Sequence, residues 1–188
     1  MSYELRSARY LAHQVMEAAI APGARVIDAT MGNGHDTAFL AELVGESGLV
    51  YAFDLQAPAV ESTRKRLESL DIENRCRLFV KGHERVLEEV HESVDAVMFN
   101  LGWLPGGDKS VTTLWETTQK AVGDCLSLLK KGGVLTLCAY PGHAEGDRER
   151  ENLMTWFASL RPQEYNVLHQ RFLNAGPGAP ECFVIQKQ

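Results

Sequence analysis

Strand-like and helix-like segments alternate along most of this chain, and their order restricts the possible folds more than any other feature. Short apolar runs are separated by longer segments with helical periodicity, which is typical of a parallel sheet with helices on both faces. We therefore predict a Rossmann-like α/β fold. The predicted strands span residues 25–29, 49–53, 76–80, 94–99 and 134–139. The predicted helices span residues 3–20, 35–44, 58–70, 84–91, 112–130 and 149–160.

The carboxyl end departs from this alternation. Residues 165–172 and 182–186 are strand-like and flank a loop rich in glycine and proline, which predicts an antiparallel hairpin. The predicted sheet then has seven strands, most of them parallel. The chain has 188 residues with no internal repeat and no linker-like stretch, so we predict a single domain over residues 1–188.

Composition excludes several classes of protein. Apolar residues make up 45% of the chain and charged residues 23%, which is ordinary for a folded domain and argues against disorder. No apolar run approaches the ~20 residues of a membrane span. The first ten residues lack the apolar core of a secretory signal, so we expect a cytoplasmic protein. The four cysteines have no metal-ligand spacing, and we expect reduced thiols and no bound metal.

The net charge of −6 argues against a broad nucleic-acid surface, which is usually basic. Positive charge is concentrated at Arg64-Lys65-Arg66, at Arg148 with Arg150, and at Arg6 with Arg9. These clusters could be small docking patches, although solvated helix faces are the more common role.

The clearest chemical pattern is Asp28-Ala-Thr-Met-Gly-Asn-Gly-His-Asp-Thr37, between the first predicted strand and the next helix. Gly32 and Gly34 allow a tight turn and a close approach to a ligand, and the helix start offers free N–H groups. Asp54 lies 20 residues after Gly34, at the end of the second strand. A carboxylate there can accept hydrogen bonds from both hydroxyls of a ribose, so the pattern predicts a nucleotide site.

The acidic residues of this motif indicate which nucleotide binds. A dinucleotide fingerprint has a third glycine three residues after the second, where this chain has Thr37. Asp28 and Asp36 would repel a pyrophosphate, but they suit the sulfonium and ammonium groups of S-adenosylmethionine (SAM). SAM is the predicted cofactor, ahead of a nicotinamide dinucleotide or a purely structural glycine turn.

Residues after the second and third strands complete the predicted SAM site. Gln56 is a second candidate for the ribose. Gly82 and His83 lie where an adenine would be bound, and His83 could stack on that ring, hydrogen-bond to it, cap a helix or simply be exposed. The residues predicted to bind SAM are Asp28, Gly32, Asn33, Gly34, Asp36, Thr37, Asp54, Gln56, Gly82, His83 and Asn100.

Asn100 ends the fourth predicted strand and begins the motif Asn100-Leu-Gly-Trp-Leu-Pro-Gly-Gly-Asp-Lys109. Chemistry in an open α/β sheet takes place at the carboxyl ends of the strands. The amide oxygen of Asn100 can accept N–H bonds from a target amine while Trp103 stacks on a planar base, although both could be ordinary turn or packing residues. We therefore predict methylation of an amine. The predicted substrate-side residues are Leu101, Trp103, Gly106, Gly107, Asp108 and Lys109.

A third motif, Tyr140-Pro-Gly-His-Ala-Glu-Gly146, follows the fifth predicted strand. It places a phenol and an imidazole at the same rim, so Tyr140 and His143 join Asn100 as predicted catalytic residues. His143 is the best candidate for a proton acceptor because an unperturbed imidazole titrates near neutrality. A single loop histidine, however, often has no function.

Together these motifs resemble those of the bacterial tRNA wobble-uridine aminomethyl methyltransferases, long labelled putative rRNA methylases. The likeness extends from Val26 to about Gly146 and more loosely to the carboxyl end. Trp103 is a departure, since many relatives have tyrosine there, and Pro141 is another. The resemblance assigns SAM binding to Asn33, Asp36, Thr37, Asp54, Gln56 and His83, and the substrate side to Asn100 through Lys109 with Tyr140 and His143.

The resemblance implies a class I SAM-dependent methyltransferase that acts as a homodimer. It implies that the amine of 5-aminomethyl-2-thiouridine, at the wobble position in the anticodon region of tRNA, receives the methyl group. Three alternatives stay open. They are a methyltransferase of ribosomal RNA or of a small-molecule amine, a non-catalytic SAM- or RNA-binding module, and a nicotinamide-linked oxidoreductase.

Overall fold

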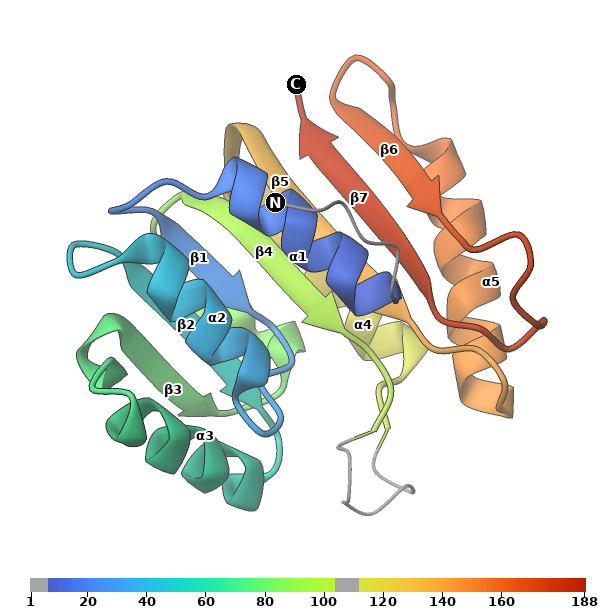
Figure 1. Ribbon diagram of the computed structural model, residues 1–188. Helices are drawn as coiled ribbons and strands as arrows, with labels where there is room; N and C mark the ends of the chain where they lie inside the picture. Colours follow the sequence, from blue (N-terminus) through green and yellow to red (C-terminus); the bar gives the residue numbers. More distant parts are fainter. Residues whose placement is uncertain (1–6, 104–111) are drawn as a thin grey trace.

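Within residues 7–103 and 112–188, which the computed structural model describes, seven strands form one sheet in the order β3-β2-β1-β4-β5-β7-β6 (Figure 1). Strand β7 runs antiparallel to both β5 and β6, and the other neighbouring strands of this sheet are parallel to each other. The strands are β1 (Arg25–Asp28), β2 (Leu49–Asp54), β3 (Cys76–Val80), β4 (Val94–Asn100), β5 (Leu129–Ala139), β6 (Tyr165–Gln170) and β7 (Glu181–Lys187). The predicted sheet and its terminal hairpin are confirmed.

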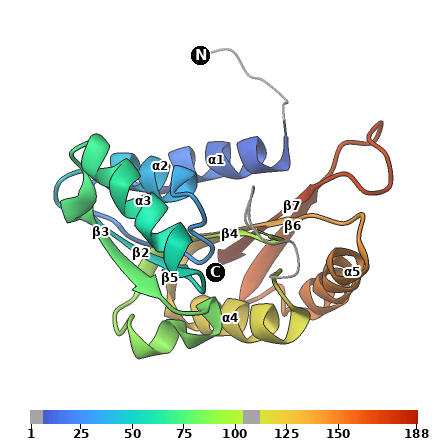
Figure 2. The ribbon, with the colours of Figure 1, turned by 90° about the horizontal axis from the view of Figure 1, so that it is seen from below.

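Helices cover both faces of the sheet (Figure 2). One face carries α1 (Ala8–Ala19), α2 (His35–Val44) and α3 (Ala57–Ser69), and the other carries α4 (Trp115–Leu128) and α5 (Ala144–Ser159). Two short 3-10 helices, η1 (Glu73–Arg75) and η2 (His83–Glu88), precede and follow β3. None of the helices in the described parts of the chain is long and apolar enough to cross a membrane.

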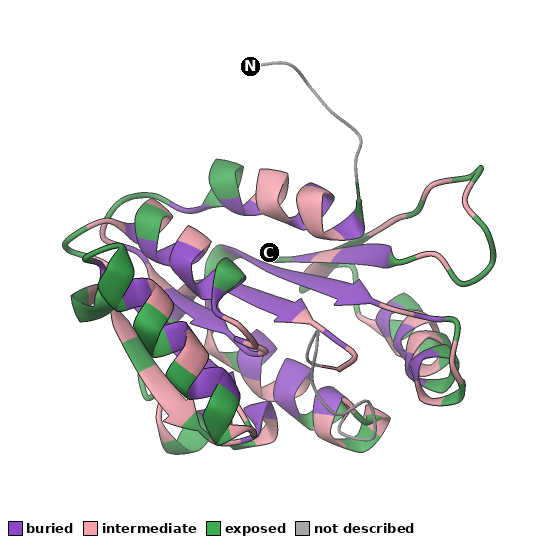
Figure 3. Cartoon of the chain, turned by 60° about the horizontal axis from the view of Figure 1, so that its bottom comes forward, coloured by how far each residue is buried: buried purple, intermediate pink, exposed green. Residues whose placement is uncertain are grey.

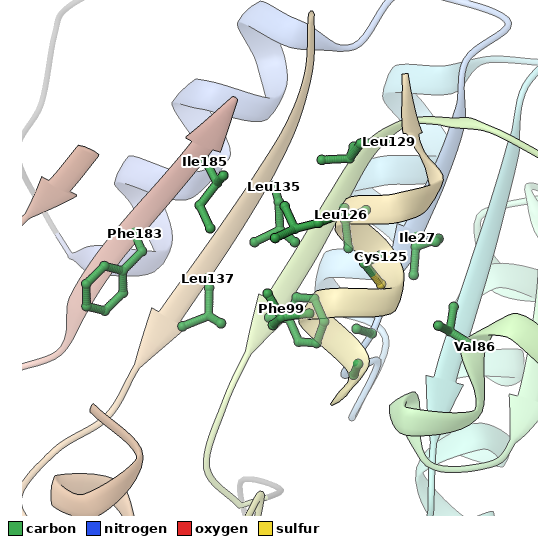
Figure 4. Packing of buried hydrophobic residues seen from close by; sticks show 14 of the residues in the cluster. Ile27, Val86, Phe99, Cys125, Leu126, Leu129, Leu135, Leu137, Phe183 and Ile185 are labelled. Carbon is green, nitrogen blue, oxygen red and sulfur yellow. The ribbon is translucent and has the colours of Figure 1, made fainter. Parts of the chain in front are cut away.

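The apolar residues of the central strands explain this layering. In β1, Val26 faces the cluster under α1 and α2, and Ile27 faces the cluster under α4 and α5; both are fully buried. A strand buried on both faces has a continuous apolar run, as a parallel sheet requires. Buried positions accordingly follow the strands and the inner sides of the helices (Figure 3). Close to the centre, Phe99 of β4 packs with Cys125 and Leu126 of α4 (Figure 4).

The predicted bounds of the helix before β5 are wrong at both ends. The helix expected over residues 112–130 spans only Trp115–Leu128, and the Lys-Lys-Gly-Gly stretch that follows belongs to β5. Lys130 pairs with Asp95 at 2.7 Å. The carboxyl end of α4 is stabilised by Lys187 of β7, whose Nζ donates to the carbonyls of Leu126 and Leu129 at 3.0 and 2.8 Å.

Two other helices begin directly after a residue whose side chain caps them. The helix expected from residue 149 begins at Ala144, because the Nδ1 of His143 accepts the N–H of Gly146 at 3.2 Å. Helix α1 begins at Ala8, since the hydroxyl of Ser7 accepts the N–H of Tyr10. The predicted start of that helix, at residue 3, lies outside the described residues.

Candidate active site

A pocket of about 630 Å³ opens at the carboxyl ends of the strands. Its volume is in the range of small-molecule sites. Residues that follow β1, β2 and β3 line one end, and residues that follow β4 and β5 line the other. Because β1 lies between β2 and β4, this is the point where the strand order reverses, the usual ligand site of such sheets.

The glycine loop after β1 is shaped by two left-handed residues. Gly32 has φ of 52° and Gly34 has φ of 77°. A Cβ on Gly34 would lie 2.8 Å from side-chain atoms of Thr63 in α3 and 2.9 Å from its Cα. The Thr63 hydroxyl in turn donates to the carbonyl of Gly32 at 2.9 Å. Helix α3 thus packs directly on the loop and leaves the backbone of Gly32 and Asn33 to line the pocket.

Asp28 and Thr37 lie beneath this loop, both buried and neither lining the pocket. The Asp28 carboxylate accepts the Thr37 hydroxyl at 2.6 Å and the N–H of Thr30 at 3.1 Å. Burial, and then the charge of Asp36, raises the pKa of Asp28 to about 7. These two predicted cofactor residues therefore hold the shape of the loop.

Asp54 lines the pocket at the end of β2. One oxygen accepts the N–H of Gly32 at 3.0 Å, and the other accepts the N–H of Gln56 at 2.8 Å. Burial raises its pKa, and the two backbone N–H groups oppose that shift. A carboxylate has about four acceptor sites, so this one can still accept two ribose hydroxyls.

The other residues predicted near an adenosine take different places. Gln56 and Gly82 line the pocket. His83 also lines it but is 8% exposed, hydrogen-bonds to the backbone of Ala29 and packs its ring on Phe99 at 5.7 Å. Burial lowers the pKa of His83, so it forms a neutral wall of the pocket.

A chain of polar side chains joins the two ends of the pocket. Asn100 donates from Nδ2 to Asp36 at 2.7 Å, and its Oδ1 accepts the hydroxyl of Tyr140 at 2.6 Å. The other oxygen of Asp36 accepts from Arg9 at 2.8 Å and from His13 at 2.7 Å. Burial by itself would raise the pKa of Asp36, but the His13 bond, the Arg9 charge and the Asn100 amide hold it below its usual value.

Arg9 and His13 were not predicted from the sequence. Their spacing of four residues places both side chains on one face of α1. This spacing was the sequence feature that could have indicated a shared partner. Nothing in the sequence indicated that this face meets Asp36.

The far end of the pocket is built from Leu101, Trp103 and His143. The rings of Trp103 and His143 lie 4.5 Å apart. A buried glutamate that the sequence did not reveal, Glu149 of α5, accepts the hydroxyl of Thr113 at 2.8 Å, and Thr113 accepts the N–H of Gly102. The predicted substrate residues Gly106, Gly107, Asp108 and Lys109 lie outside the described residues.

Comparisons with known proteins identify the family. The family model described as "Putative rRNA methylase" matches residues 50–186. The chain belongs to this family. It is 39% identical to a tRNA (mnm(5)s(2)U34)-methyltransferase, chloroplastic, of Arabidopsis thaliana, over 97% of this chain and 70% of the relative.

Solved structures agree. A putative rRNA-methylase from Clostridium thermocellum is 36% identical, with a TM-score of 0.97 over 99% of this chain and 100% of that one. A putative methyltransferase from Streptococcus mutans, solved in complex with S-adenosylhomocysteine (SAH), is 34% identical with a TM-score of 0.90, over 98% of this chain and 100% of that one.

These findings confirm the resemblance, the class I methyltransferase fold and SAM as the cofactor. The chain is a SAM-dependent methyltransferase, which excludes the oxidoreductase and the non-catalytic module. The residues present fit SAM, since Gly32 and Asn33 line the pocket beside the Asp54 carboxylate, which has acceptor sites left. Gly34 does not line the pocket, but a side chain there would meet Thr63 of α3 and displace the loop. Among residues 7–103 and 112–188, no group of three or more histidine, cysteine or acidic side chains could hold a metal ion.

The carboxylate of Asp54 supplies a testable prediction. We expect Asp54→Ala to raise the Kd for SAM by roughly 10- to 100-fold, because a hydrogen bond to a charged group contributes about 1.5–3 kcal/mol. Isothermal titration measures this Kd, and thermal melting without SAM shows whether the variant is folded. Asp124→Ala, at an exposed ion pair on α4, is the control. An unchanged Kd in folded Asp54→Ala contradicts the assignment.

Proposed function

We propose that this methyltransferase converts 5-aminomethyluridine, or its 2-thio form, at the wobble position of tRNA to the 5-methylaminomethyl nucleoside. One observation carries the proposal. Asn100, Tyr140 and Trp103 all line the pocket, and the Asn100 oxygen is the atom that accepts the Tyr140 hydroxyl. The name of the Arabidopsis relative supports the same substrate.

An acceptor oxygen is what an amine substrate requires. Bound SAM supplies a methyl group on a positively charged sulfur. A primary amine is mostly protonated at neutral pH and must lose one proton before its lone pair can attack. The Oδ1 of Asn100 has a second lone pair, which can accept an N–H of the amine and orient it. The new N–C bond then forms as the S–C bond breaks, leaving SAH.

The aromatic residues suit an unpaired base. Anticodon bases can be turned out into a pocket, where stacking on an aromatic ring is worth about 1–3 kcal/mol per base. Trp103 and Tyr140 line the same end of the pocket as Asn100. Burial raises the pKa of Tyr140 far above its usual value, so its phenol stays neutral and donates to Asn100.

We propose for His143 a role other than that of the proton acceptor that the sequence predicted. Its Nδ1 accepts the N–H of Gly146, so a neutral ring carries its hydrogen on Nε2. A ring in that state has no unused lone pair to accept a proton, and its Nε2 is buried. We propose that His143 supports Trp103 and the start of α5.

A local basic rim accounts for RNA binding by an acidic protein. Arg66 donates to the carbonyl of Asn33 at 2.8 Å and contacts His35 at 3.0 Å, and it has no carboxylate partner among the described residues. Its two contacts, Asn33 and His35, both line the pocket. Burial, followed by the charges of Arg66 and Arg9, lowers the pKa of His35. By contrast, Arg148 and Arg150 are paired with acids, so the rim is the better candidate for a phosphate contact.

We expect Arg66→Gln to raise the KM for tRNA without changing the Kd for SAM. Loss of one phosphate contact should reduce the slope of log affinity against log salt by about 0.7–0.9. Binding of tRNA at several salt concentrations measures this slope. Arg161→Gln, at an exposed pair at the far end of α5, is the control. Equal slopes for Arg66→Gln and the wild type contradict the assignment.

Mass spectrometry of digested tRNA tests the reaction itself. The enzyme and SAM are incubated with tRNA that carries the aminomethyl nucleoside, and we expect that nucleoside to gain the mass of one methylene group. Parallel samples with ribosomal RNA and with free aminomethyl nucleoside test the alternatives. A gain confined to either of these, with no change in the tRNA nucleoside, contradicts the proposal.

Two further expectations remain predictions. The homodimer that the resemblance implies can be tested by light scattering of the purified protein. The cytoplasmic location can be tested by cell fractionation; the plant relative is described as chloroplastic.

A further inference from the structure

We infer that Asp36, held by Arg9 and His13, is a positioning residue that determines which atom of the Asn100 amide is presented to the substrate. The inference rests on the proposed role of Asn100 as acceptor for an amine. It gives Asp36 a different role from the SAM ligand that the sequence predicted. It also makes α1, which comes before the glycine loop, part of the catalytic apparatus.

The orientation of the amide follows from the chemistry of its neighbours. An ionised carboxylate can only accept hydrogen bonds, so Asn100 must turn its Nδ2 toward Asp36, and the two atoms lie 2.7 Å apart. Its Oδ1 then points the other way, where Tyr140 donates to it at 2.6 Å. Both contacts fix the same orientation. Because Asn100 and Tyr140 both line the pocket, we infer that the atom presented on the substrate side is the acceptor Oδ1.

The contacts from α1 keep Asp36 in the state that this orientation needs. Arg9 and His13 both bond to its Oδ1, and the ring of His13 is itself held by stacking on Phe39 at 3.9 Å. The residue is 7% exposed. A protonated Asp36 would be a donor and would allow the Asn100 amide to turn, so the charge from α1 stabilises one orientation.

Asp36 has little capacity left for a ligand. Arg9, His13 and Asn100 occupy three of about four acceptor sites on its carboxylate. Asp54, which accepts two backbone N–H groups within the described residues, keeps more of its capacity. Loss of the Asp54 carboxylate is therefore expected to raise the Kd for SAM, whereas loss of the Asp36 carboxylate is expected to lower kcat.

Asp36→Asn tests the inference because it keeps the shape of the side chain and changes only its hydrogen bonding. Its amide oxygen is expected to stay on Arg9, so its NH₂ faces Asn100. Asn100 must then turn its oxygen toward position 36 and present Nδ2 to Tyr140 and the amine, so that no amide oxygen is left there to accept the N–H of the amine. We expect kcat to fall by about 10²- to 10³-fold, as for loss of one aligned hydrogen bond in other enzymes, with the Kd for SAM unchanged.

The exchanged pair, Asp36→Asn with Asn100→Asp, gives the sharper result. The carboxylate at position 100 accepts from the NH₂ at position 36 and again presents an oxygen to Tyr140 and the pocket. We expect the double variant to recover at least about tenfold in kcat over Asp36→Asn, a coupling that independent sites do not show. Asn100→Asp alone brings two carboxylates together and should be as impaired as Asp36→Asn.

Controls separate this role from a structural one. Asp124→Asn makes the same chemical change at an exposed pair on α4 and should leave kcat unchanged. If Asp36→Asn does not fold, as judged by thermal melting, His13→Ala provides the test. It should lower kcat at unchanged Kd for SAM, and His13→Gln, which restores a donor, should recover activity.

The outcomes are distinct. A wild-type enzyme that does not methylate the tRNA nucleoside contradicts the proposed function. With an active wild type, the inference is overturned if Asp36→Asn has normal kcat, if it loses SAM affinity but not kcat at saturating SAM, or if the exchanged pair shows no recovery. If Asp36→Asn is unfolded, a normal kcat in His13→Ala overturns it as well.

Discussion

Replacement of Asn100 by alanine is expected to lower kcat by about 10²- to 10³-fold, the usual cost of removing one aligned hydrogen bond at a reacting centre. The change removes the oxygen that would accept the N–H of the amine and leaves Tyr140 and Asp36 without their partner. The Kd for SAM should change little, because Asp54 and the glycine loop lie at the other end of the pocket. Single-turnover methyl transfer to tRNA measures the rate, and isothermal titration with SAM measures the Kd.

Two companion variants sharpen this result. Asn166→Ala, at an exposed position of β6, makes the same substitution away from the pocket and should be fully active. Tyr140→Phe removes one of the two contacts that orient Asn100, so it should lower kcat by a smaller factor. Wild-type kcat in Asn100→Ala, or lost SAM binding as its main effect, contradicts the role that we give Asn100.

Gly34→Ala is expected to lower the free energy of unfolding by about 2–5 kcal/mol. A non-glycine residue in the left-handed region costs about 1–3 kcal/mol, and overpacking adds a similar amount. The second cost is unavoidable here, since the new Cβ would lie 2.9 Å from the backbone of Thr63. Because α3 must move away, the bond from Thr63 to Gly32 should weaken, and the affinity for SAM should fall with stability. Urea denaturation and SAM titration measure the two effects.

Gly123→Ala is a control with the opposite sign. Gly123 lies inside α4, and a Cβ there would meet nothing within 4 Å. The change should stabilise the protein by up to about 1 kcal/mol, the difference in helix propensity between alanine and glycine. Equal effects at the two positions would contradict the close approach of α3 to the loop.

The sheet could be predicted from the sequence because its signals are local. Val26 and Ile27 belong to an apolar run that only a strand covered on both faces can bury, and Gly32 and Gly34 mark the turn that follows. Asp54 could be predicted because its distance from the loop is fixed by one helix and one strand.

The partners of these residues could not be predicted, since they come from distant parts of the chain. Asp36 meets Arg9 and His13 only because α1 packs on the sheet beside α2, and no local pattern shows that packing. The same holds for Lys187, which caps α4 from the last strand. The contact of His143 with Gly146 is different, because it is local. It was not predicted because histidine is not among the usual N-cap residues.

A crystal structure of the enzyme with SAH tests the central claim most directly, namely that the glycine loop and Asp54 hold the nucleoside while Asn100 faces its sulfur. We expect the ribose hydroxyls on the Asp54 carboxylate, the sulfur beside Asn100, and the Asn100 Nδ2 still bonded to Asp36. SAH bound away from this loop, or an Asn100 side chain turned away from the sulfur, would contradict the account.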